Sequence, residues 1–168
     1  GQNKPELDKL QLEKSAKHNN IGDKPDLNSS TPVVEGLTRP GNGWQRINFA
    51  NTAKGRYLAI ECESTHDGKP VAIAEIHLIG KDGKRLNRDN WTVKYADSEN
   101  LRGNHTGDKA FDMQESTFWQ TEAGAPMPHL LVIDLGAELE ASAIEYLPRA
   151  EQGAPGSMKD FKLHIFNR

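Results

Sequence analysis

The sequence has no large aromatic side chain in its first 43 residues. The chain has 168 residues, and its 3 Trp, 3 Tyr and 5 Phe all lie between Trp44 and Phe166. A single hydrophobic core usually spans ~100–200 residues and needs large apolar side chains. We therefore expect one folded domain over residues 44–168, preceded by a linker or surface strap over 1–43. Pro5 and the spacing of Leu7 and Leu10 predict a short helix over 5–18 in that extension.

Cysteine, long apolar runs and excess positive charge are also scarce. The single Cys62 excludes an internal disulfide framework and a zinc site built from several thiolates. No apolar run approaches the ~20 residues of a membrane-spanning helix. With 21 Lys and Arg against 24 Asp and Glu, the formal charge of −3 provides no basic field for phosphates or anionic lipid. We therefore expect neither nucleic acid nor a membrane as partner.

The common signatures of hydrolytic enzymes are missing as well. None of the 6 histidines follows the H-x-x-x-H or H-E-x-x-H spacing of a metal-hydrolase helix, and there is no G-x-S-x-G nucleophile elbow. Glu61, Glu63 and Glu75 fall on predicted strands, where carboxylates usually form a solvated face rather than a glycosidase pair across a cleft. We therefore expect that the chain is not an enzyme.

From residue 44 onward, short runs of alternating apolar and polar residues are separated by turn residues. Tyr57, Ala59 and Glu61 alternate with Leu58, Ile60 and Cys62, as in a strand with one buried face. Such short strands with almost no helical periodicity predict an all-β fold, an antiparallel β-sandwich. The seven predicted strands cover residues 44–50, 56–63, 72–79, 91–96, 130–135, 142–147 and 160–166.

Three segments carry a resemblance when they are taken together. Residues 109–121 read KAFDMQESTFWQT, residues 128–136 read PHLLVIDLG, and residues 146–149 read YLPR. Their order and spacing resemble the discoidin domain, also called the coagulation factor V/VIII type C domain, and are most similar to its bacterial carbohydrate-binding relatives. The resemblance implies a discoidin-like jelly roll over residues 44–168.

Two further segments match that family out of order. Residues 55–60 (GRYLAI) and 73–76 (IAEI) resemble the strands that normally close a discoidin domain, yet here they come first. The chain either joins the tail of one domain to the head of the next or is one circularly permuted domain. Each motif occurs once, and permutation accounts for a single complete set because domain termini commonly lie close together.

The resemblance also implies a structural calcium ion, since the family commonly binds one in the loop that contains the aspartate. The expected ligands are the Lys109 carbonyl, the Asp112 carboxylate, Thr117 and Glu75, which offer the oxygen atoms that calcium prefers. Two positions depart from the family pattern: Met113 replaces a Gly that eases the tight turn, and Gln114 stands where an Asp or Asn is usual. The alternative is that Asp112 only caps the loop by accepting backbone N–H groups.

In the bacterial relatives, loops at one end of the sandwich bind sugar through an aromatic face and a few polar groups. By position, Gln120 and Arg149 match residues that bond ligand, whereas Ala123 stands where some relatives carry a stacking Trp. Glu151 and Gln152 lie near the position of a family carboxylate but out of register with it. With the neighbouring loop residues, the expected ligand site comprises Asn104, His105, Gln120, Glu122, Arg149, Glu151 and Gln152.

These expectations define a non-catalytic carbohydrate-binding module that recognises a polysaccharide or oligosaccharide. We expect it in a bacterial polysaccharide-degrading system, outside the cell, in the periplasm or on the cell surface, as a monomer working beside a glycoside hydrolase. The alternative is a structural or protein-interaction module of the same fold that has lost sugar binding. The absence of a stacking Trp at position 123 favours that alternative.

Overall fold

The computed structural model describes residues 22–167. The helix expected over 5–18 therefore lies outside the described residues. Between residues 22 and 167, antiparallel strands dominate and the helical segment that is defined is the 3₁₀ helix η2 (Gly107–Phe111). The strands are β1 (Val34–Leu37), β2 (Gln45–Cys62), β3 (Ala72–Ile73), β4 (Glu75–Ile79), β5 (Thr92–Ala96), β6 (Trp119–Gln120), β7 (His129–Leu147) and β8 (Asp160–Phe166).

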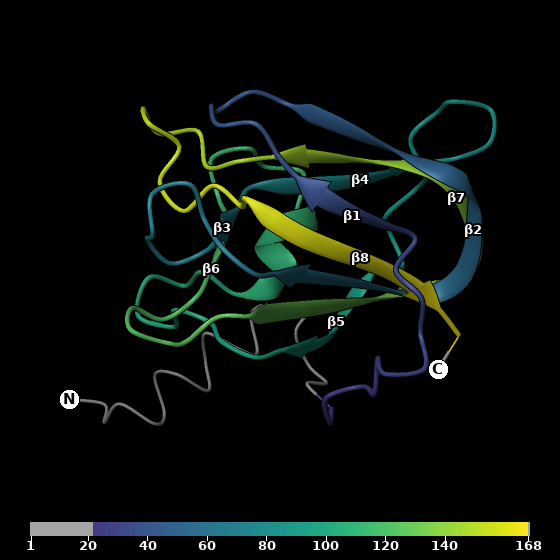
Figure 1. Ribbon diagram of the computed structural model, residues 1–168, viewed down its shortest axis with the longest axis horizontal. Coiled ribbons are helices and arrows are strands. Elements are labelled where there is room, and N and C mark those ends of the chain that lie inside the picture. The colour runs from purple at the N-terminus through teal and green to yellow at the C-terminus, as the bar shows by residue number, and fades with distance from the viewer. Residues whose placement is uncertain (1–21, 168) are drawn as a thin grey trace.

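Two long bent strands organise the fold. β2 and β7 pair along both of their halves, from Gln45 opposite Tyr146 to Cys62 opposite His129. Register shifts interrupt this pairing between Asn48 and Ala53 and again between Gly55 and Tyr57, where the strands curve (Figure 1). Shifts of this kind increase bend and twist, so one strand can serve two faces of a core.

The remaining strands divide between the two halves of the bent pair. β4 pairs with the second half of β7, whereas β5 pairs with the first half. β8 pairs with the second half of β2, and β1 extends that side of the sheet. β3 and β6 form a separate two-stranded sheet at the end of the molecule away from the bend (Figure 1). The all-β, antiparallel character expected from the alternation is confirmed.

The main core lies between the two halves of the bent pair. Leu58, Ile60 and Ile133 from one half belong to the same buried cluster as Ile76 and Ile144 from the other. Their neighbours in sequence face outward, because successive side chains of a strand point to opposite sides. The alternation in residues 57–62 thus separates the two faces of the strand, although Ala59 on the outer face is also buried, in a second cluster.

The segment before residue 44 contributes to the packed structure. Its strand β1 pairs with β8, from Val34 opposite Leu163 to Leu37 opposite Asp160. Leu27 packs on the outer face of the sheet against the buried cluster of Ala59, Leu130 and Val132. The backbone N–H of Gly22 donates to the Lys94 carbonyl at 2.9 Å, at the edge of β5. Packing therefore begins well before residue 44.

Candidate functional site

The predicted ligand residues gather around a stack of three side chains at the end of the molecule near β3 and β6. The His105 ring lies 4.1 Å from the Phe118 ring, centroid to centroid, with 17° between the planes. The Arg149 Cζ lies 4.4 Å from the centroid of the same Phe118 ring. The Phe118 ring therefore packs against both the imidazole of His105 and the guanidinium of Arg149.

The backbone holds His105 in this position. Its N–H donates to the Asn100 carbonyl at 3.0 Å, and its carbonyl accepts the Gln120 N–H at 3.1 Å. Gly103 lies directly against the ring, because a Cβ there would be 2.4 Å from the His105 Cδ2. Burial, and after it the positive charge of Arg149, lowers the pKa of His105. The ring is thus favoured in its neutral form, which both donates and accepts hydrogen bonds.

Amide and charged groups surround the stack. Asn100 Nδ2 donates to Gln120 Oε1 at 3.3 Å, and the Asn100 N–H donates to the Gln120 carbonyl at 2.7 Å. Arg149 also forms an ion pair with Glu151, with 2.6 Å between Nη2 and Oε2. The guanidinium therefore contacts both an aromatic face and a carboxylate, which fixes its direction.

The structure brings together only some of the seven predicted ligand residues. His105, Gln120, Arg149 and Glu151 belong to the cluster, and Asn104 is exposed at a loop tip beside His105 with a φ of 59°. Among the described residues, the exposed side chains of Glu122 and Gln152 form no hydrogen bond or ion pair with this cluster.

Phe118 and Asn100 were not predicted as part of the site. Phe118 precedes the fully buried Trp119 in an extended segment, so strand alternation places Phe118 on the side opposite Trp119 and on the same side as Gln120. That alternation was readable from the sequence. The Asn100–Gln120 bond joins residues 20 apart, and no local pattern points to it.

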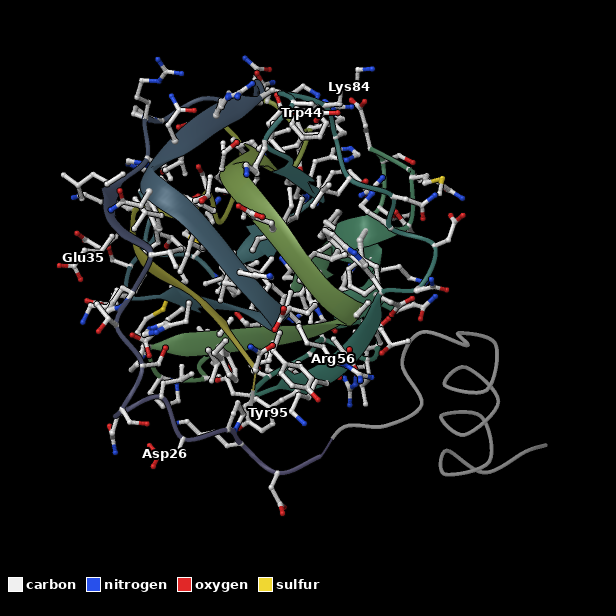
Figure 2. All side chains as sticks on the ribbon, turned by 90° about the vertical axis from the view of Figure 1, so that its right-hand side faces the viewer. Asp26, Glu35, Trp44, Arg56, Lys84 and Tyr95 are labelled. Atoms are coloured by element: carbon white, nitrogen blue, oxygen red, sulfur yellow. The ribbon has the colours of Figure 1, made fainter. Side chains whose placement is uncertain are left out.

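Trp44 lies on the same small apolar cluster as Phe118. The half-buried Trp44 packs against this cluster, whose members are Ala72, Ala74, Phe118 and Leu147. Arg85 Cζ lies 4.8 Å from the Trp44 ring, and Arg85 Nε donates to Glu145 at 2.8 Å. In Figure 2, Trp44 lies beside Lys84 at one extreme of the molecule, and Arg56 and Tyr95 lie toward the other. Trp44 thus provides an aromatic side chain near the stack, although position 123 has none.

The ring of His77 lies 5.5 Å from that of Trp44. Burial, followed by the positive charges of Arg88 and Arg85, lowers the pKa of His77 to about 4. The folded protein therefore resists protonation of His77, whereas the unfolded chain accepts a proton near pH 6.5.

We expect this histidine to make the fold less stable in acid. Its contribution is complete above pH 6.5 and is lost as the pH falls from 6.5 toward 4. The variant His77→Phe keeps a ring beside Trp44 and removes the titrating group. In urea denaturation, the free energies of unfolding of the variant and the wild type should differ by a constant amount above pH 6.5. Below pH 6.5 the variant should become progressively more stable relative to the wild type. Parallel curves across the whole range would disprove the assignment.

The predicted calcium ligands lie around a second, partly buried cluster. Asp112 accepts the Gln114 N–H at 3.0 Å through Oδ1 and the Thr117 hydroxyl through Oδ2. The Thr117 hydroxyl also lies 3.1 Å from the Gln114 carbonyl oxygen. Lys109 lies just before this loop in η2, and its amino group pairs with Asp108 at 3.7 Å. The loop bonds fit the capping role considered for Asp112.

Glu75 reaches the same loop from β4. Its Oε1 accepts a bond from Arg88, while its Oε2 is buried and has no hydrogen-bond partner. Burial raises the pKa of Glu75 to about 7, Arg88 opposes this rise, and the nearby Asp112 adds to it. A buried carboxylate oxygen without a partner, beside a second carboxylate, is costly unless a cation or proton neutralises it.

This oxygen-only set fits a hard cation. Calcium prefers carboxylate, hydroxyl and carbonyl oxygens, and Glu75 Oε2, Asp112, Thr117 and the carbonyl groups of the loop are of these kinds. The set contains only two carboxylates, and among residues 22–167 no three His, Cys, Asp or Glu side chains are grouped to hold a metal. Such a low charge count corresponds to a weak site.

A wide groove lies away from both clusters. It has a volume of about 800 Å³ and lies where the segment before β1 meets the end of β8 (Figure 1). None of the seven predicted ligand residues lines it. Its walls are Asp26, Ser29, Ser30, Thr31, Ile165, Phe166 and Asn167.

Comparison with known proteins leaves the family open. No protein-family model matches the chain, and no curated protein matches it closely enough to indicate a relationship. In residues 22–167, no helix has the length and apolar character needed to cross a membrane. The functional argument therefore rests on the geometry of the two clusters.

Proposed function

We propose that the chain is a non-catalytic carbohydrate-binding module whose ligand site is the cluster around Phe118. The observation that carries this proposal is the convergence of His105, Gln120, Arg149 and Glu151 at one end of the fold. Together they offer imidazole, amide, guanidinium and carboxylate groups to the hydroxyls of a sugar. The rigid Phe118 ring packs against His105 and Arg149 and holds them in place, which limits the entropy lost when ligand binds.

The discoidin-like fold belongs to the same proposal. In a circularly permuted jelly roll, residues 56–63 and 130–135 must pair within one sandwich. Their pairing, from Tyr57 opposite Asp134 to Cys62 opposite His129, supports that reading. A chain that joined two half-domains would have no reason to pair these segments with each other.

Trp44 supplies the aromatic contact that position 123 lacks. Its ring shares an apolar cluster with Phe118, and Arg85 and Glu145 flank it with hydrogen-bonding groups. A glycan that reaches from Arg149 to Trp44 contacts more than one sugar unit, so an oligosaccharide or polysaccharide fits better than a monosaccharide.

Calcium would brace the loop next to this site. Glu75, Asp112, Thr117 and the Lys109 carbonyl would hold it, and the ion would neutralise the buried Glu75 and the partly buried Asp112 carboxylates. The surrounding system is a bacterial polysaccharide-degrading one, located outside the cell, in the periplasm or on the surface, with a glycoside hydrolase as neighbour. The module itself is a monomer without catalytic activity.

A glycan array followed by titration of the best ligand tests this function. Arg149→Ala should weaken binding at least ~tenfold, because it removes a charged hydrogen-bonding group from the centre of the site. Trp44→Ala should weaken binding of long oligosaccharides more than that of short ones. Arg56→Ala is the matched control, since Arg56 pairs with Asp134 at 2.9 Å far from Trp44 (Figure 2).

The same experiment separates the proposal from its alternative. If the protein binds no glycan on the array, a structural or protein-interaction module of the same fold is favoured. Glycan binding that survives both Arg149→Ala and Gln120→Ala would place the sugar site elsewhere on the molecule.

A further inference from the structure

Arg88 is a charged residue enclosed by the fold. Only 6% of its side chain is exposed, and its carboxylate partner Glu75 is 2% exposed. Arg88 Nη1 donates to Glu75 Oε1 at 2.7 Å and to the Ile76 carbonyl at 3.0 Å. The guanidinium is therefore fixed both by an ion pair and by the backbone of β4.

This pair belongs to the cluster proposed to hold calcium. Glu75 has one oxygen bonded to Arg88 and one buried oxygen without a partner, and Asp112 lies close enough to affect the Glu75 carboxyl. With both carboxylates ionised, Glu75 and Asp112 carry two negative charges, and Arg88 neutralises one of them. One unit of negative charge remains for an external cation.

We propose that Arg88 is a built-in counter-ion that stabilises the buried Glu75 carboxylate without metal and weakens the binding of a divalent cation to Glu75 and Asp112. The inference depends on the proposed cation site and not on sugar binding. Arg88 limits Glu75 to a single free oxygen, and its positive charge repels any cation that binds there. Removing one partner of a buried ion pair leaves an uncompensated charge, which calcium can then neutralise.

The variant Arg88→Met tests this role by two measurements. One is thermal melting in chelator and in calcium, and the other is titration of the chelator-treated protein with calcium. In chelator, Arg88→Met should melt well below the wild type. Saturating calcium should restore most of the loss, because a ligand that binds only the folded state stabilises it. The dissociation constant for calcium should fall at least ~tenfold relative to the wild type, since the repelling charge is gone.

Two controls isolate the charge. Arg88→Lys keeps a positive charge with fewer donors, so it should lose stability but bind calcium about as weakly as the wild type. Arg56→Met removes an exposed ion pair elsewhere and should leave the calcium response unchanged. Tight calcium binding by Arg88→Lys would contradict the proposal.

Three further results would overturn it. These are an equal calcium response in the wild type and Arg88→Met, equal stability of the two in chelator, and an Arg88→Met variant that stays unfolded at saturating calcium. If Arg88→Met binds calcium and the wild type does not, the inference stands and the structural calcium of the native module is wrong. None of these results bears on the glycan titrations with Arg149→Ala.

Discussion

Replacing Gly156 with alanine should lower the free energy of unfolding by ~3–5 kcal/mol. Gly156 has a φ of 73°, and a Cβ there would lie 2.0 Å from the Pro70 carbonyl oxygen and 3.0 Å from the Ala72 nitrogen. Both contacts are with backbone, which cannot rotate away as a side chain does. The substitution therefore forces the loop that contains Gly156 away from residues 70–72.

The close approach at Gly156 also joins two parts of the proposed site. The Gly156 carbonyl accepts the Ala72 N–H at 3.0 Å, and its N–H donates to Asp67. Arg149 and Glu151 lie earlier in the same loop, while Ala72 pairs with Gln120. We expect Gly156→Ala to weaken glycan binding in addition to stability.

Gly153 provides the matched control for this prediction. Its φ of 82° is as strained for alanine, but a Cβ there has no atom within 4 Å. Gly153→Ala should cost only ~1–2 kcal/mol, the penalty of the left-handed conformation alone. Urea denaturation of both variants measures the difference. Equal losses would show that the loop does not lie against Pro70 as closely as described.

The strand boundaries predicted from the sequence are most accurate for a strand that pairs with one neighbouring strand on each side. Strand β8 covers the predicted residues 160–166, because Phe161, Leu163 and Ile165 recur at every second position along it. Predicted runs 44–50 and 56–63 are instead parts of β2, and 130–135 and 142–147 are parts of β7. The polar and glycine residues between them resemble turns, yet they bend a continuous strand pair. Local patterns do not separate these two outcomes.

Two short strands were not predicted, for a different reason. β1 and β6 have four and two residues, and their strand character depends on partners far along the chain. The predicted run 72–79 is divided at Ala74 between two sheets, since β3 pairs with β6 and β4 with β7. Such a division depends on tertiary contacts alone.

The sites show the same limit. Motif spacing placed Gln120 and Arg149 in one site, and the structure brings them near the same stack. Motif spacing did not predict a role for Arg88, because the surrounding residues 87–90 (NRDN) resemble an exposed turn. Burial of Arg88 follows from its bond to Glu75 on β4, which no pattern within residues 87–90 encodes.

Trp119 links the core to the proposed site, and Trp119→Ala should cost ~3–5 kcal/mol. The side chain is fully buried, and its indole N–H donates to the Ser98 carbonyl at 3.0 Å. Phe118 and Gln120 are its immediate neighbours in sequence, so a cavity at Trp119 frees both from the core. We therefore expect weaker glycan binding together with the lost stability, measured by titration and by urea denaturation followed by circular dichroism.

Trp91 makes the hydrogen bond of Trp119 measurable. It is also fully buried and packs edge-on against Phe111 at 5.8 Å, but its indole nitrogen has no hydrogen-bond partner. Phenylalanine at either position removes similar volume, while only Trp119→Phe leaves a carbonyl without its donor. Trp119→Phe should therefore cost ~1 kcal/mol more than Trp91→Phe. Equal losses would mean that the bond to Ser98 adds nothing, and that β6 is anchored by apolar packing alone.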